Sequence, residues 1–279
     1  MPIEAGFLGL VKVNGTEFRC NSMSSSPTQT VLPYTHIYGL NDFGTGSTTK
    51  GEEVGSVQPQ KTIWRPSMKF ITGSFDFPAD EDNLGTLFDY IKTGNYITTI
   101  EFQYTCGTGV TFTNCRLNQY TFRVTAGDIL NISVGFTATD VQNSSGSGAY
   151  EESKKFITWD KVDIIVDEIS TEIQSVDFSV TNEIIPIYTA DGTEFGGGLF
   201  GLRDMRLGTQ NVTGTISTYI KPIEYLFDET SISSVINITV DPGLAIEIKA
   251  VLTPLQVSTS TGLFSAGVAF TGVGYALGQ

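Results

Sequence analysis

The feature that most constrains the fold of this 279-residue chain is that its sequence contains one pattern twice. Thr72-Gly73 and Thr213-Gly214 lie 213 − 72 = 141 positions apart, and Phe136-Thr137 and Phe270-Thr271 lie 270 − 136 = 134 positions apart. Small differences in loop length account for such a drift in spacing. A repeat of more than about 100 residues has the size of a small domain and is too long for a solenoid unit. The sequence therefore predicts two tandem copies of one domain.

Each copy is predicted to be rich in β-strands. Apolar and polar residues alternate over residues 130–139, and residues 264–271 repeat this alternation at the common offset of 134. Such alternation is typical of strands with one face on a core and the other facing water. Each copy also has one short helical pattern, after Pro78 and after Pro222. The predicted organisation has three parts: domain 1 at residues 1–140, a Ser- and Gly-rich linker at residues 141–154, and domain 2 at residues 155–279.

The composition favours a structural protein over an enzyme. With 30 acidic and 16 basic residues, the net charge of −14 disfavours ordinary binding to DNA or RNA, which needs basic side chains. The single histidine, His36, has no cluster of metal ligands beside it, and the three cysteines are predicted to be free thiols. Asp80-Glu81-Asp82 is interpreted as the charged start of a helix rather than a metal site. We therefore expect no catalytic site, no cofactor, no metal and, without a long apolar run, no membrane insertion.

Several segments resemble the tail tube proteins of long-tailed bacteriophages. In the second half, the strand pattern at residues 174–183 ends in Thr181-Asn182 and leads through a loop to Leu202–Gly208 and the Val-Thr-Gly-Thr strand at Val212. The first half matches more loosely, at residues 71–75. The likeness covers most of the chain but rests on pattern, since the family has no invariant motif.

The resemblance implies an all-β fold with minor α: two tandem tail-tube-like domains, each of two packed antiparallel sheets with one short flanking helix. In the family, six such domains per ring form an inner β-barrel, and stacked rings form the hollow tube that delivers the genome. A duplicated chain is expected to form a ring of three with pseudo-sixfold symmetry. The implied partners are further copies of itself, the tape measure protein and other tail proteins, with transient passage of DNA. The implied location is the virion tail, after assembly in the host bacterial cytoplasm.

Two alternatives remain at this point. One is a distal-tail or baseplate-hub ring protein, which shares the fold without the repeated stacking. The other is a β-sandwich adhesion or carbohydrate-binding module, which should expose aromatic residues in a groove or at loop tips. Most aromatic residues of this chain fall instead on the predicted inward face of strands.

Two sets of residues are predicted to carry the assembly function. Small polar and acidic side chains on the outward strand face are expected to line the lumen and let DNA pass without specific contacts. These candidates are Glu101, Gln103, Asn131, Ser133, Thr137, Thr139, Ser265 and Thr271. A long segment between Gly39 and Gly73 is expected to reach the adjacent ring. Its candidates are Gly44, Gly46, Lys50, Gly51, Glu52 and Glu53.

Overall fold

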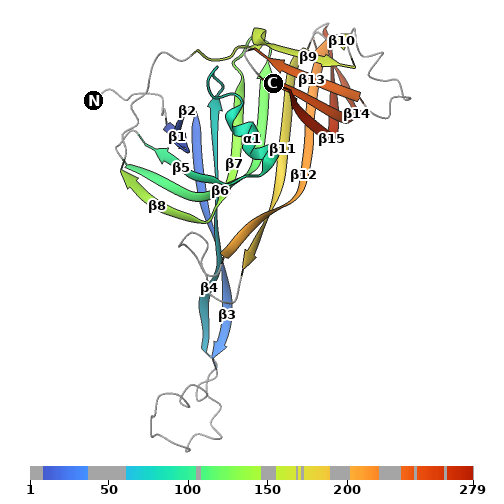
Figure 1. The fold of residues 1–279 in the computed structure, drawn as a ribbon. Coiled ribbons are helices and arrows are strands. Elements are labelled where there is room, and N and C mark those ends of the chain that lie inside the picture. Colours follow the sequence, from blue (N-terminus) through green and yellow to red (C-terminus); the bar gives the residue numbers. More distant parts are fainter. Residues whose placement is uncertain are drawn as a thin grey trace, which may run out of the picture.

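The described part of the chain is almost entirely antiparallel β-sheet (Figure 1). The computed structural model describes residues 9–36, 61–104, 108–145, 155–167, 169–170, 173–188, 202–219, 234–241, 244–260 and 263–278. Within these ranges there is one α-helix, α1 (Thr86–Thr93), and one short 3-10 helix, η2 (Trp159–Lys161). The prediction of an all-β protein with minor α is confirmed.

The fifteen described strands fall into a first and a second half of the chain. The strands of the first half are β1 (Gly9–Val13), β2 (Thr16–Cys20), β3 (Ser22–His36), β4 (Lys61–Pro78), β5 (Ile97–Gln103), β6 (Thr108–Thr125), β7 (Asn131–Ala138) and β8 (Asp140–Ser145). Those of the second half are β9 (Val162–Val166), β10 (Ile169–Ser170), β11 (Ile173–Tyr188), β12 (Leu202–Tyr219), β13 (Ser234–Val240), β14 (Leu244–Ser260) and β15 (Leu263–Gly278).

In the first half, the long strand β6 belongs to two sheets. Its beginning pairs with β5 and β8, and β5 continues through β1 to β2. Its end pairs with β7, which continues through β4 to β3. The pairing orders are therefore β2-β1-β5-β6 and β6-β7-β4-β3.

The second half repeats this pairing order around the long strand β14. One branch runs β10-β9-β13-β14 and the other runs β14-β15-β12-β11. The beginning of β14 pairs with β13, while β15 accompanies β14 along most of its length. In this half, β15 pairs with both the beginning and the end of β14. In the first half, β8 pairs with the beginning of β6 and β7 pairs with its end.

The core of the first half lies between its two sheets and is rich in phenylalanine. Phe18 on β2 packs edge-on against Phe77 on β4, with ring centroids 5.1 Å apart. Phe102 on β5 likewise meets Phe136 on β7 at 5.8 Å. All four rings are fully buried, so each contributes about 1.5 to 3 kcal/mol of apolar burial that holds the sheets together.

The helix α1 begins later than the acidic residues before it suggest. Asp80 is buried and accepts hydrogen bonds at Oδ1 from the backbone N–H groups of Asp82 and Asn83, both at 3.0 Å. These bonds cap a turn, and α1 itself runs from Thr86 to Thr93. Gly94 caps its C-terminal end with a φ of 64°, which favours glycine.

The structure also differs from the sequence prediction at the expected linker. Residues 140–145 form β8, which pairs with the beginning of β6 from Asp140↔Thr113 to Ser145↔Thr108. This pairing was missed because the segment is polar: it is an edge strand whose outer face meets water. The second predicted helix, after Pro222, lies outside the described residues.

Candidate assembly interface

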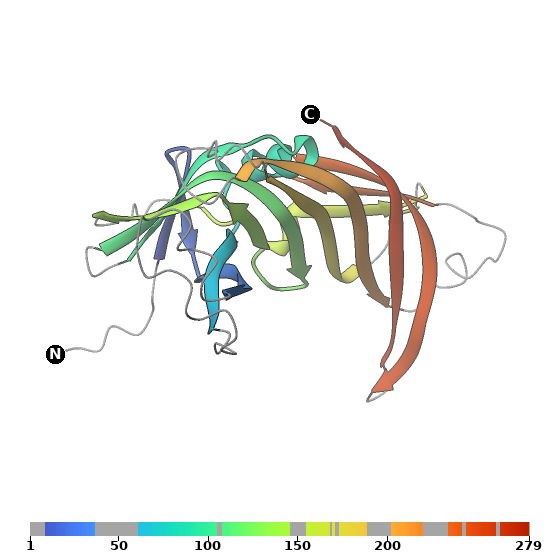
Figure 2. The ribbon, with the colours of Figure 1, turned by 90° about the horizontal axis from the view of Figure 1, so that it is seen from below.

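The two halves of the chain are joined through the edges of their sheets. β6 from the first half pairs with β11 from the second in an unbroken antiparallel register, from Thr125↔Ser175 to Gln119↔Thr181. Figure 2 shows the strands on both sides of this junction lying side by side in one curved sheet. The chain therefore contains, within itself, an edge-to-edge contact between two similar sheets.

The two faces of the β6–β11 junction differ in chemistry. On one face, the Arg123 Nε donates to Asp177 Oδ2 at 2.8 Å, and the hydroxyls of Thr121 and Ser179 are 3.0 Å apart. On the other face, the paired residues Phe122 and Phe178 are fully buried. The junction thus continues both the polar surface and the apolar core of the sheets that it joins.

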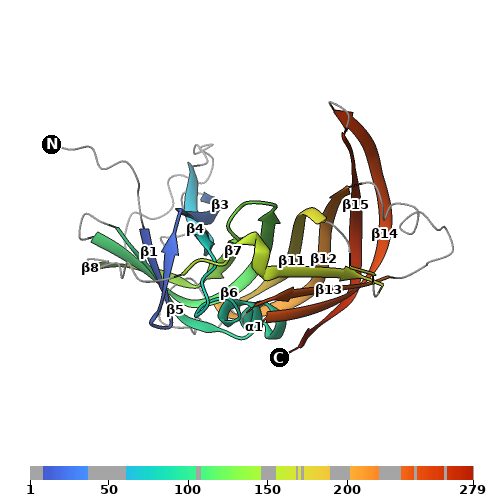
Figure 3. The ribbon, with the colours of Figure 1, turned by 90° about the horizontal axis from the view of Figure 1, so that it is seen from above.

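The helix α1 covers this junction from the core side (Figure 3). Phe88 on α1 packs against Tyr120 of β6 at 5.1 Å and against Phe178 of β11 at 6.2 Å between ring centroids. The Nδ2 of Asn182, on β11, donates to the carbonyl oxygen of Ile91 at 2.8 Å. Residues of the second half therefore cover part of the buried face of α1 and supply a hydrogen bond to one of its last carbonyl groups.

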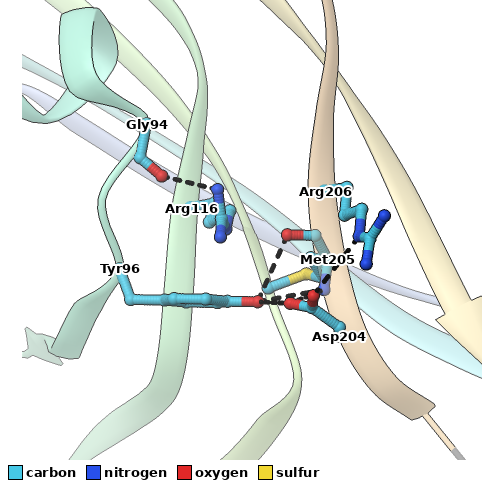
Figure 4. A network of polar contacts seen from close by, with 6 residues as sticks. All are labelled: Gly94, Tyr96, Arg116, Asp204, Met205 and Arg206. Atoms are coloured by element: carbon cyan, nitrogen blue, oxygen red, sulfur yellow. Dashed lines mark hydrogen bonds and ion pairs between the residues drawn. The ribbon is translucent and has the colours of Figure 1, made fainter.

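A polar network fixes the segment after α1 to β12 (Figure 4). The Tyr96 hydroxyl donates to Asp204 Oδ1 at 2.6 Å and accepts the backbone N–H of Met205 at 2.9 Å. The guanidinium of Arg116 lies 4.0 Å from the centre of the Tyr96 ring and donates to the Gly94 carbonyl at 2.6 Å. Residues more than 100 positions apart in the sequence are thereby held in one arrangement.

The hydrogen bond between Tyr96 and Asp204 shifts the pKa values of both side chains. The hydrogen bond from Tyr96, more than any other contact, lowers the pKa of Asp204 below its ordinary value. Burial, together with the bond to Asp204, raises the pKa of Tyr96. At neutral pH the network therefore consists of a neutral tyrosine and an ionised aspartate.

One face of the joined sheet is lined by hydroxyl groups. The register aligns one residue from each of seven strands in a single row: Asp76, Ser133, Thr121, Ser179, Thr213, Thr271 and Val251. Six of the seven side chains are polar, and one of these is charged. The opposite face carries the buried apolar residues, so this face is the polar side of the sheet, with Val251 as the one apolar residue of the row.

The predicted lumen residues do not all lie on this hydroxyl-lined face. Ser133 and Thr271 belong to its row, and Asn131 shares the face with Ser133. Ser265 lies on β15 at an even number of positions from Thr271. Glu101 and Gln103 lie on β5, which belongs to the other sheet, so grouping them with Ser133 was wrong.

Thr137 and Thr139 were expected to be outward-facing, but both are buried. The hydroxyl of Thr137 accepts from Asn118 Nδ2 at 3.2 Å, and that of Thr139 donates to the Thr113 carbonyl at 3.0 Å. Both lie where β7 passes from one sheet toward β8 in the other, and strand alternation does not reveal that crossing.

The predicted inter-ring residues Gly44, Gly46, Lys50, Gly51, Glu52 and Glu53 lie outside the described residues. The strands that lead to them are described. β4 pairs with β7 only over Ile71–Pro78, so Lys61–Phe70 and its partner strand β3 continue beyond the sheet as a two-stranded arm. Figure 1 shows this arm extending away from the body of the molecule.

Sequence reasoning missed the Tyr96 network and the pairing of β6 with β11. Asp204 belongs to a segment noted only for its family likeness, and nothing in the spacing of Tyr96 or Arg116 connects them to it. Strand pairing between halves leaves no local sequence signal, because the same alternation suits any neighbouring strand.

The described residues contain no group of three His, Cys, Asp or Glu side chains placed to hold a metal ion. In the same part of the chain, no helix has the length and apolar character required to cross a membrane. Cys20 and Cys115 are buried free thiols, and burial raises the pKa of both.

Comparison with known proteins agrees with this architecture. A comparison with curated proteins finds no match. A family model described as phage tail tube protein matches residues 38–271, which include β4 to β14 and the first part of β15. The chain therefore belongs to the phage tail tube protein family, whose members are structural components of the virion tail.

Proposed function

We propose that this protein forms closed rings that stack into the hollow tube through which the phage genome is delivered. The observation that carries this proposal is the β6–β11 junction, where one sheet continues into the next without a break. If further copies join in the same way, the sheet closes into a barrel that leaves no exposed edge.

We propose that the chain is an internal duplication. The β3–β4 pair has a bulge between Gln29 and Val31, and the β11–β12 pair has one between Asn182 and Ile184. These positions differ by 182 − 29 = 153 and 184 − 31 = 153, so an irregular feature recurs at a constant spacing. The matching pairing orders of the two halves support the same interpretation.

A duplicated chain supplies two of six positions, so three chains would complete a ring. The ring would have pseudo-sixfold symmetry, with within-chain and between-chain junctions in alternation. We infer that the hydroxyl-lined face meets the lumen, because the outer sheet and α1 cover the opposite face. Neutral hydroxyls and a net charge of −14 would offer DNA no site at which to bind.

The two-stranded arm of β3 and β4 supports a role in stacking. The arm extends away from the sheet, and its two strands are joined in the sequence by residues 37–60, which include the predicted inter-ring candidates. We propose that this segment contacts the neighbouring ring, and that the protein has a purely structural role. Its further partners would be the tape measure protein and other tail proteins, met during assembly in the host cytoplasm.

Negative-stain electron microscopy of the purified protein tests the ring and tube directly. Tubes or stacked rings support the proposal, whereas single rings that never stack would indicate a distal-tail or hub component. Deleting residues 43–56 should leave a folded chain that no longer forms tubes. A variant with the same residues replaced by an equally long Gly-Ser segment serves as the matched control for loop length. Normal tubes from the deletion variant would show that this segment is not the stacking element.

A further inference from the structure

In the sheet that contains the β6–β11 junction, two strand edges remain unpaired among the described residues of a single chain. β3 pairs with β4 alone, and the end of β14, beyond Ala250, pairs with β15 alone. Both edges belong to the same sheets as the β6–β11 junction. An open edge presents backbone N–H and C=O groups that can bind another strand.

The two open edges correspond to the two strands that meet inside the chain. Ser25 pairs with Gly73 and Phe178 pairs with Gly214, so β3 matches β11 at an offset of 178 − 25 = 153. On the other side, β6 matches β14. Ile132 pairs with Phe122, and its counterpart Ala266, 134 positions later, pairs with Val257. The offset between Phe122 and Val257 is 257 − 122 = 135.

Applying both offsets to the β6–β11 register gives the register of a contact between chains. Within the chain, Asp177 lies opposite Arg123. Subtracting 153 from the first position gives Ser24, and adding 135 to the second gives Ser258. The same operation places Ser26 opposite Gln256 and Ser22 opposite Ser260.

We propose that Ser22–Ser26 of one chain pairs antiparallel with Gln256–Ser260 of a second copy, with Ser24 directly opposite Ser258. This proposal rests on the proposed ring and specifies the strands and register of its between-chain junction. The second copy is the occupant that the structure favours, because the within-chain junction already shows these two kinds of edge fitting together.

The between-chain junction would differ from the within-chain one in its polar contacts. The ion pair of Arg123 and Asp177 is replaced by two serines, so no salt bridge holds this register. Likewise, adding the offset of 135 to Arg116 of β6 gives Val251 of β14, so an apolar residue stands where the within-chain junction has an arginine. Val251 is 41% exposed in the single chain. Association between chains therefore depends on backbone pairing and apolar contact rather than on charge.

Disulfide trapping tests the register. In a Cys106→Ser background, the pair Ser24→Cys and Ser258→Cys should form disulfides between chains, because directly opposed Cβ atoms lie about 4.5–5.5 Å apart. Under mild oxidation, assembled rings should then yield covalent dimers and trimers on a non-reducing gel. The matched positive control is Arg123→Cys with Asp177→Cys, which should form the equivalent bond within one chain.

A shifted pair, Ser24→Cys with Ser260→Cys, measures the alternative register, since diagonal neighbours lie about 7–8 Å apart. Microscopy of the same samples shows whether rings are present, which separates failure of this register from failure of the proposed function. The proposal is overturned if rings form and the shifted pair is trapped instead. It is also overturned if rings form and only the within-chain control becomes oxidised.

Discussion

Replacing Tyr96 with phenylalanine tests whether the polar network stabilises the contact between the two halves. The substitution removes the hydroxyl that donates to Asp204 at 2.6 Å but keeps the ring that lies against Arg116. Met205 is not left unpaired, because its N–H also donates to Asp204 Oδ1 at 2.8 Å. The main loss is one hydrogen bond to a partly exposed charged group, so we expect a decrease of about 1 to 2 kcal/mol in the free energy of unfolding.

The pH dependence of this variant follows from the lowered pKa of Asp204. A carboxylate whose pKa is lower in the folded state adds stability above its unfolded pKa, and this stability is lost as the pH falls through the folded value. Tyr96 is the largest cause of the shift. The difference between wild type and Tyr96→Phe should therefore shrink as the pH falls below about 4.

Urea denaturation measures the loss, and hydrogen exchange at the Met205 amide locates it. Tyr90→Phe is the matched control, because it removes an exposed tyrosine hydroxyl that accepts only a neutral hydrogen bond from Asn14, at 2.9 Å. A double-mutant cycle with Asp204→Asn should give a coupling energy of about 1 kcal/mol. A Tyr96→Phe variant no less stable than Tyr90→Phe, or a coupling energy near zero, would refute the reasoning.

Four further substitutions test the packing and the junction. Tyr120 has a buried hydroxyl with no hydrogen-bond partner among the described residues, so Tyr120→Phe should raise the free energy of unfolding, by up to about 1 kcal/mol. A loss of stability in urea would contradict this. A Cβ added at Gly73 would meet a buried phenylalanine ring, and one added at Gly214 would meet both such a ring and the Asp177 carbonyl oxygen. Each glycine-to-alanine change should cost about 1 to 3 kcal/mol, with the larger cost at Gly214; equal urea midpoints for the two variants would contradict the ranking. Asp177→Asn breaks an exposed ion pair with Arg123 and should cost less than about 1 kcal/mol, with no difference from wild type in 1 M salt; a larger or salt-independent loss would show another role for the carboxylate.

Local patterns predicted most of the strands because alternation reports burial directly. The segment at residues 130–138 alternates as a half-buried strand should, and it forms β7 over Asn131–Ala138. Similar sequence patterns also occur on strands that have similar neighbours. Phe136 and Phe270 both lie beside a glycine on the neighbouring strand, as their shared spacing suggested.

The features that sequence reasoning missed depend on contacts between distant segments. β8 is polar because it is an edge strand, so its composition is typical of a linker. Thr139 is buried where the chain crosses from one sheet to the other, and the two-residue alternation of a strand does not predict this burial. Tyr96 and Asp204 meet only because α1 lies over the strands of the second half.

The mass of the assembled ring tests the central claim most directly. If the chain supplies two of six positions, native mass spectrometry of single rings should give three copies of the 30.2 kDa chain. Cryo-electron microscopy of the same rings should show sixfold symmetry at low resolution that reduces to threefold symmetry in detail. A ring of six chains would contradict the account.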